Sequence, residues 1–255
     1  MSPRPTPTAM SRITVITICL NAAERLERCV RSVLAQTRLP DEYLFVDGGS
    51  TDGTLPLLDG LCAKLQAAGI STQVIQQEQL PGEAGIPSAW NQGIQKATGE
   101  IIAMLNSDDF YAPTTLSTVE AGFAIGCDLY VGSISLVNEK CEKVGEIHPK
   151  CLFMQEIMMA IPHPACFVAK ATYDKVGLYD TSYRISADYD FIWRCRKAQM
   201  RFRYSEKFFT SMETGGTANS SRALARNETL AIALKYSRIP LLARIAWLLR
   251  KITGR

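Results

Sequence analysis

The chain has 255 residues, of which 47% are hydrophobic and 21% charged, with a formal net charge of +3 at pH 7. It is therefore long enough to bury a substantial core without disulfides or structural metals. The eight cysteines are widely spaced and form no CxxC pair, which argues against a zinc site and favours reduced thiols in the cytoplasm. No apolar run approaches the roughly eighteen residues that span a bilayer, and residues 1–11 read as a disordered polar tail rather than a signal peptide.

Strand and helix patterns alternate through residues 12–112. Apolar runs predict strands at residues 13–20, 43–46 and 101–105, and a weaker pattern predicts a fourth at residues 73–76. The intervening segments predict helices at residues 22–37, 54–68 and 85–97. In the first helix the charged side chains, Arg25 and Arg28 among them, fall on the face opposite the apolar one. This order of elements predicts an α/β fold with a doubly wound, mainly parallel sheet.

Polar side chains follow three of these strands where each strand ends, at residues 17–21, 47–52 and 106–109. Ligands of an open α/β sheet bind beyond the carboxyl ends of its strands, so we expect a site there. Asp108 and Asp109 are adjacent carboxylates, and a divalent cation such as Mg²⁺ or Mn²⁺ would relieve their repulsion. The alternative for Asp108 is a helix cap.

The pattern is less regular in residues 113–221. We expect strands at 129–137 and 165–169, helices at 151–161 and 190–200, and a mobile glycine-bearing loop at 210–221. This half would extend the same sheet in a mixed fashion and form the other wall of the cleft.

The polar strand ends carry recognisable motifs. These are ITVITICLNAAERLERCVRSVLAQT, VDGGSTDGT, GEAGIPSAWNQGIQKATGEIIAMLNSDDFY, HPACFVAKATYDKVGLYD and SADYDFIWR, in that order. Together they resemble family 2 glycosyltransferases of the GT-A fold over about residues 12–220. Within that family the chain is most similar to bacterial enzymes that build lipopolysaccharide, capsule or exopolysaccharide. The resemblance implies inverting transfer of a sugar from a nucleotide-diphosphate sugar, with a UDP-sugar favoured, to a hydroxyl of a glycan or lipid-linked acceptor.

The resemblance also assigns residues to the donor and to the metal. The positions that match the family's donor site are Thr17, Asn21, Asp47, Glu83, Asn91 and Asp108. Asp47 would accept the imide hydrogen of a uracil base, and turn chemistry is the alternative for it. Asp108 and Asp109 match the acidic motif that holds Mn²⁺ or Mg²⁺ against the diphosphate. The chain departs from the family at Asn106 and Gly48, where aspartates are common.

On the acceptor side, Asp188 matches the family's catalytic base. Asp190 would point elsewhere, with Arg194 as a solvated or salt-bridged neighbour. His163 is either an acceptor-side residue or a buried, hydrogen-bonded histidine. Gly215 and Gly216 match a loop that closes over the donor in relatives.

Residues 222–255 contain eight Lys or Arg and one Glu, a local charge of +7, and predict basic amphipathic helices. Residues 239–252 are apolar with interspersed basic residues, which favours peripheral attachment to the inner face of the cytoplasmic membrane. The alternatives are packing on the catalytic domain or on a second subunit in a homodimer. A sugar nucleotidyltransferase and an inactive GT-A scaffold are the rival functions. Nucleic-acid binding has little support, because the basic tail carries one tryptophan but no aromatic stacking platform.

Overall fold

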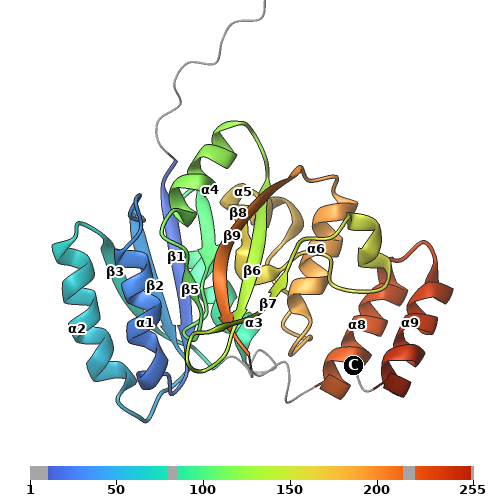
Figure 1. The fold of residues 1–255 in the computed structure, drawn as a ribbon, viewed down its shortest axis with the longest axis horizontal. Coiled ribbons are helices and arrows are strands. Elements are labelled where there is room, and N and C mark those ends of the chain that lie inside the picture. The colour runs from blue at the N-terminus through green and yellow to red at the C-terminus, as the bar shows by residue number, and fades with distance from the viewer. Residues whose placement is uncertain (1–10, 80–84, 215–221, 254–255) are drawn as a thin grey trace, which may run out of the picture.

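The structure is a computed structural model that describes residues 11–79, 85–214 and 222–253. In these residues nine strands form one sheet, flanked by helices on both faces (Figure 1). The strand order is β3-β2-β1-β4-β8-β6-β9-β5, and β7 pairs with β6 beside this path. One sheet therefore spans both halves of the predicted division at residue 112.

The first half follows the predicted alternation. Its four strands are mutually parallel, with β1 in register with both β2 and β4. The elements are β1 Ile13–Cys19, α1 Ala23–Leu34, β2 Glu42–Asp47, α2 Thr54–Ala67, β3 Ser71–Gln76, α3 Ile86–Lys96 and β4 Ile101–Met104.

The second half extends the sheet with mixed pairing, as expected. Strand β8 pairs antiparallel with β4 and β6, whereas β9 runs parallel to β6. The elements are β5 Phe110–Tyr111, α4 Thr115–Ala124, β6 Leu129–Val137, β7 Lys143–Ile147, β8 Cys166–Ala169, α5 Lys170–Val176, α6 Ala187–Lys197 and β9 Phe202–Glu213.

Two predictions in this half are wrong. Residues 151–161 form only a short 3₁₀ helix, Leu152–Glu156, and a second one follows at His163–Ala165. The Gln155 side chain accepts the N–H of Ala160 and donates to the carbonyl of Tyr189, so side-chain bonds replace a helical ladder. Residues 210–213 of the expected loop complete β9, because they pair with β6 and β5. The rest of that loop from residue 215 on, with Gly215 and Gly216, lies outside the described residues.

The strands place alternate side chains in two cores. Ile13, Val15 and Cys19 of β1 pack with α1, α2 and α4, whereas Ile16 packs with α3, α5 and α6. This alternation is the period of two of a strand buried on both faces. A Cβ at Gly93 would lie 2.6 Å from the Cγ2 of Ile16, so glycine there allows α3 to approach β1 closely.

The C-terminal tail forms α8 Arg222–Tyr236 and α9 Pro240–Thr253, which lie side by side next to α6 (Figure 1). Ile232, Ala233 and Ala243 of the tail are buried against Tyr189 and Trp193 of α6. The tail thus packs on α6 of the same domain, one of the predicted alternatives. No helix in the described part of the chain is long and apolar enough to cross a membrane.

Helix α9 leaves one apolar stripe exposed. The stripe consists of Leu241, Ile245, Leu248, Leu249 and Ile252, with exposed fractions between 45% and 72%. Arg244 and Lys251 are exposed on the same helix.

Candidate active site

The three polar strand ends meet at one edge of the sheet, because β1, β2 and β4 are parallel neighbours. Cys19 lies opposite Asp47 in the β1–β2 register, and the N–H of Leu105 donates to the carbonyl of Ile16 at 2.9 Å. The sulfur of Cys29 on α1 contacts the carbonyl of Asn106 at 3.4 Å. The structure therefore brings together the segments that the sequence predicts to converge.

The first two strand ends are fastened to each other. The Asn21 side-chain oxygen accepts the N–H of Thr51 at 2.9 Å, and the N–H of Asn21 donates to the Ser50 hydroxyl at 2.9 Å. Asn21 has a φ of 50°, in the left-handed region that asparagine tolerates better than most residues. Asn21 thus fixes the turn after β2 with its side chain and remains exposed.

Asp47 is fully buried, and its carboxylate organises the turn. Its Oδ2 accepts the N–H groups of Gly49 and Ser50 at 3.0 and 2.9 Å, and its Oδ1 accepts the Ser50 hydroxyl at 2.5 Å. Turn chemistry, the alternative given for Asp47, is what the structure displays.

Thr17 does not face the strand ends. It is fully buried, and its hydroxyl lies 2.9 Å from the Tyr43 hydroxyl. The physical reason is strand parity, because residue 17 points to the same face as Val15 and Cys19, beneath α1. The place of Thr17 in the donor site stays a prediction, and in this structure its hydroxyl lies beneath α1.

The carboxylates after β4 differ in environment. Asp109 is 1% exposed, and its Oδ2 accepts a hydrogen bond from the Asn106 amide at 3.1 Å. Its Oδ1 is buried without a hydrogen-bond partner among the described residues. Burial and the neighbouring charge of Asp108 raise the pKa of Asp109 to about 8, although Asn106, the Glu213 amide and Arg28 act in the opposite direction. Asp108 itself is partly exposed.

An arginine pair lies beside these carboxylates. Arg28 donates to the carbonyl of Asp108 at 2.8 Å and to the carboxylate of Glu213 at 2.6 Å, and Arg25 donates to Glu213 at 3.0 Å. Burial opposes ionisation of Glu213, but the hydrogen bonds from Arg28 and Arg25 outweigh it and lower the pKa of Glu213. Arg25 is exposed, as expected, whereas Arg28 is partly buried, and both bind Glu213 at the end of β9.

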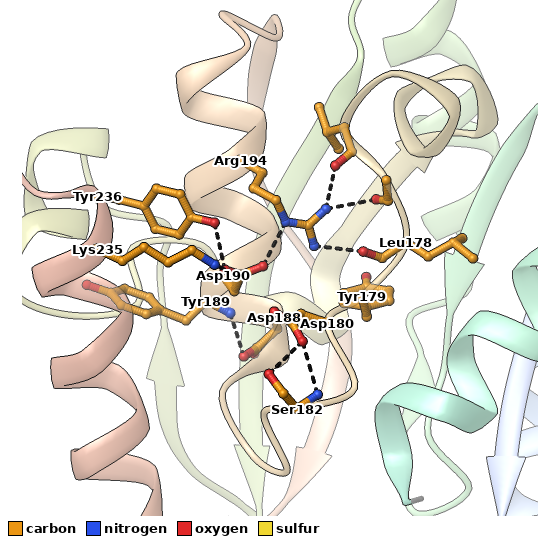
Figure 2. A network of polar contacts seen from close by, with 12 residues as sticks. Leu178, Tyr179, Asp180, Ser182, Asp188, Tyr189, Asp190, Arg194, Lys235 and Tyr236 are labelled. Atoms are coloured by element: carbon orange, nitrogen blue, oxygen red, sulfur yellow. Dashed lines mark hydrogen bonds and ion pairs between the residues drawn. The ribbon is translucent and has the colours of Figure 1, made fainter. Parts of the chain in front are cut away.

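Asp188 and Asp190 begin α6 and have different surroundings (Figure 2). Asp190 is fully buried, and its carboxylate accepts hydrogen bonds from Arg194 at 2.7 Å and from the Tyr236 hydroxyl at 3.0 Å. Asp188 is half-buried and accepts the N–H of Tyr189 at 2.7 Å. Burial raises the pKa of Asp188 to about 6, the Tyr189 hydrogen bond lowers it, and the charge of Glu228 raises it.

Arg194 is a structural residue. Besides pairing with Asp190, its guanidinium donates to the carbonyl oxygens of Val176, Gly177 and Leu178. Figure 2 shows this fan of hydrogen bonds holding the loop that leads to Tyr179. The predicted salt bridge is present within α6, and the hydrogen bonds to residues 176–178 connect α6 to the end of α5 and the loop after it.

Asn91 and His163 both form hydrogen bonds with Tyr179. Asn91 exchanges two hydrogen bonds with the Tyr179 backbone, at 2.8 and 2.9 Å. His163 is 8% exposed, lies 2.8 Å from the Tyr179 hydroxyl and packs against Trp90 with ring centroids 4.6 Å apart. Burial lowers the pKa of His163 to about 4, so the imidazole is neutral. The structure thus has the buried, hydrogen-bonded histidine of the two alternatives. Glu83 lies outside the described residues.

Residues 14–230 match the sequence profile of glycosyl transferase family 2. The chain belongs to glycosyl transferase family 2. It is therefore a glycosyltransferase, and its mixed α/β architecture is that of the GT-A fold.

Relatives with similar sequences carry glycosyltransferase names. The chain is 30% identical over 218 residues to a "PGL/p-HBAD biosynthesis glycosyltransferase" of Mycobacterium bovis, which covers 83% of this chain and 81% of the relative. A protein of the same name from Mycobacterium tuberculosis gives the same values.

Solved structures with low sequence identity share the fold. A mannosyltransferase of Pyrobaculum calidifontis, in complex with GDP-Man and Mn²⁺, superposes with a TM-score of 0.68 at 17% identity, over 95% of this chain and 71% of that one. Residues 1–349 of S. aureus TarS in complex with UDP-GlcNAc give 0.65 at 16% identity, over 92% and 70%. The chain spans 43% of the longer TarS chain.

Asp108 and Asp109 suit the divalent cation that this glycosyltransferase family implies. A buried carboxylate oxygen without a partner, next to a second carboxylate, is a stable arrangement once a cation lies between them. In the described ranges no three His, Cys, Asp or Glu side chains are arranged to hold a metal ion. Such a site fits a cation that takes its remaining ligands from water and phosphate oxygens, as Mg²⁺ commonly does.

Sequence reasoning missed Arg28, Glu213 and Glu228. Arg28 and Glu213 meet although they are 185 residues apart, and no local pattern pairs them. Glu228 had a signal, because it is the single acidic residue in a basic segment. A single negative charge among positive ones indicates a specific contact, and Glu228 accepts the backbone N–H groups of residues 184–186.

Proposed function

We propose that the protein is an inverting, metal-dependent glycosyltransferase with Asp188 as its general base. The observation that supports this most strongly is the contrast between the two acidic positions. Asp109 is buried beside Asp108 with an oxygen that lacks a partner, and Asp188 is half-buried with a pKa near 6 at the start of α6. A donor-side cation site and a separate base are the two parts that direct displacement requires.

In the proposed reaction Asp188 accepts the proton of an acceptor hydroxyl. The hydroxyl oxygen then forms a bond to the anomeric carbon, while the bond from that carbon to the diphosphate oxygen breaks and its electron pair leaves with the nucleotide diphosphate. Attack from the face opposite the leaving group inverts the configuration. A pKa of about 6 leaves Asp188 ionised at neutral pH and more basic than an ordinary aspartate.

The donor side is proposed to consist of Asn21, the turn that Asp47 organises, and Asp108. Asp108 and Asp109 would hold Mn²⁺ or Mg²⁺, which neutralises charge on the departing diphosphate when bound. Among the neighbours, one structure contains GDP-Man with Mn²⁺ and another UDP-GlcNAc, which supports a nucleotide-diphosphate sugar as donor. Within that class we favour a UDP-sugar.

The acceptor is proposed to be a glycan or lipid-linked hydroxyl in bacterial surface polysaccharide synthesis. The exposed apolar stripe of α9, flanked by Arg244 and Lys251, supports peripheral attachment of a cytoplasmic enzyme to an anionic membrane. The alternative use of the stripe is a homodimer contact, which light scattering would reveal.

The family match favours glycosyl transfer over the nucleotidyl transfer of the rival function. An inactive scaffold is disfavoured because burial of Asp109 with an unbonded oxygen costs stability unless a ligand compensates for it.

Product stereochemistry tests the proposal. UDP-GlcNAc, UDP-glucose and GDP-mannose are first ranked by thermal shift with Mn²⁺, since a ligand that binds the folded state raises the melting temperature. The donor with the largest shift is then hydrolysed slowly by the enzyme, and proton NMR identifies the anomer released first. Inversion is expected, so release of the anomer with the donor's own configuration would refute the mechanism.

A further inference from the structure

The start of α6 is held by a single side chain from the C-terminal tail. Glu228 on α8 accepts three backbone N–H groups, from Arg184 at 2.9 Å, Ile185 at 2.9 Å and Ser186 at 2.8 Å. These are the three residues that precede Ala187, the first residue of α6. One carboxylate thus satisfies three consecutive donors, and hydrogen bonds to an ionised acceptor are the strong kind.

The helix itself lacks the usual local cap. Ser186 is the N-cap residue, but its side chain makes no capping hydrogen bond to the helix. Its hydroxyl lies instead 3.3 Å from the carbonyl of Ala225 and 3.4 Å from the hydroxyl of Thr229, both on α8. Helix α8 therefore does not replace the missing cap inside the first turn, but it binds the N-cap residue and the two residues before it. These contacts fix the path by which the chain enters α6.

Asp188 lies two residues after Ser186, within this first turn. We propose that Glu228 is a positioning residue, which fixes the start of α6 and thereby holds Asp188 in place for catalysis. This inference rests on the proposed role of Asp188 as the base. Because a general base works only within hydrogen-bond reach of its substrate, a shift of about 1 Å can cost roughly 10²-fold in rate.

Contacts other than those of Glu228 also hold the tail on α6. Ile232 and Ala233 are buried against Trp193, and the Tyr236 ring stacks on Trp193 with centroids 5.9 Å apart. The Tyr236 hydroxyl also donates to Asp190. Removal of the Glu228 carboxylate should therefore loosen residues 184–186 and leave the α6–α8 interface intact.

The test combines Glu228→Ala and Glu228→Gln with Tyr236→Phe as the matched control, in the full-length protein. Tyr236→Phe removes a hydrogen bond between the same two helices without touching residues 184–186. Nucleotide release is measured with the donor among UDP-GlcNAc, UDP-glucose and GDP-mannose that gives the largest thermal shift with Mn²⁺. We expect Glu228→Ala to lower kcat by roughly 10- to 100-fold with the KM for donor within about twofold. The kcat of Glu228→Gln, which keeps one acceptor oxygen, should lie between those of Glu228→Ala and the wild-type protein. Tyr236→Phe should keep near-normal kcat.

The decisive comparison is made in the Asp188→Asn background. If Glu228 acts through Asp188, Glu228→Ala should cause little further loss there, because the effects of coupled residues are not additive. A full additional loss, a primary defect in donor KM, or an unchanged kcat in Glu228→Ala would overturn the positioning role. Near-normal turnover of Asp188→Asn alone would refute the base assignment itself and the positioning role with it.

Hydrogen exchange provides a readout that needs no substrate. Amides 184–186 should exchange faster in Glu228→Ala than in the wild-type protein, whereas the amides of residues 191–197 should be unchanged. Unchanged protection of residues 184–186 would contradict the contact on which the inference rests.

Discussion

Replacement of Asp109 by asparagine should make the metal-free protein more stable at alkaline pH. The buried carboxyl has a pKa of about 8, against an ordinary value of 3.8. A carboxyl whose pKa is raised by folding favours the folded state when protonated. Its contribution is therefore fully present below about pH 4 and is lost as the pH rises through 8. Asparagine keeps the shape and the contact with Asn106 but never acquires the charge.

The magnitude follows from the shift. Between pH 5 and pH 8 the wild-type protein should lose on the order of 3–4 kcal/mol of unfolding free energy through Asp109, as an upper limit because water entry relaxes a buried charge. Asp188, with its pKa near 6, acts in the same direction, and His163, with its pKa near 4, acts in the opposite direction. Both are present in the variant, so the difference between the two proteins isolates Asp109.

Urea unfolding at pH 5 and pH 8, in EDTA and in Mn²⁺, measures this difference. We expect the wild-type protein to lose more stability than Asp109→Asn in EDTA, and Mn²⁺ to restore it at pH 8 in the wild-type protein only. Transfer activity should be absent in EDTA and return with Mn²⁺ or Mg²⁺. Equal pH dependence of the two proteins, or equal stabilisation of both by Mn²⁺, would refute the reasoning.

Three further predictions concern the surroundings of the site. Arg28→Ala should raise the Mn²⁺ concentration for half-maximal activity about tenfold, and more at pH 6.5 than at pH 8.5, because loss of the guanidinium raises the pKa of Asp109 and Mn²⁺ binds the ionised carboxylate. Arg31→Ala, at an exposed position of the same helix, is the control, and an equal effect there would contradict the assignment. Asp190→Asn should destabilise the fold by roughly 3 kcal/mol, as judged by urea unfolding, because it breaks a buried ion pair with Arg194, while turnover falls far less than in Asp188→Asn. The double variant Leu241→Glu/Leu248→Glu should no longer float with phosphatidylglycerol vesicles, whereas the wild-type protein and Ile125→Glu, which changes an exposed residue outside α9, should float. Equal flotation of these three proteins would exclude α9 as the anchor.

The parallel half of the fold could be predicted because β1, β2 and β4 contain continuous apolar runs that end at polar residues. The same property allowed the prediction that Asn21, residues 47–52 and residues 106–109 lie together at one edge of the sheet. The face of the sheet to which each strand residue points was harder to predict, because a strand buried on both faces shows no alternation in polarity. The sequence therefore could not show that the Thr17 hydroxyl lies beneath α1.

Residues whose roles depend on distant partners were beyond sequence reasoning. Arg28 has the appearance of a solvent-facing helix residue until β9 brings Glu213 beside it. Residues 151–161 carry a helical composition, but the side-chain bonds of Gln155 favour another path. Turn chemistry was one of the two predictions for Asp47, since Asp side chains commonly bond the backbone two residues on, and the sequence Asp-Gly-Gly-Ser allows such a turn.

The central claim, that Asp188 is the catalytic base, is tested most directly by measuring donor affinity and turnover in Asp188→Asn. The amide keeps the shape of the side chain and its contact with the Tyr189 N–H, but it cannot accept a proton from the acceptor. We expect nearly normal donor affinity and a fall in turnover of roughly 10²-fold or more. Near-normal turnover, or weakened donor binding as the main defect, would contradict the assignment.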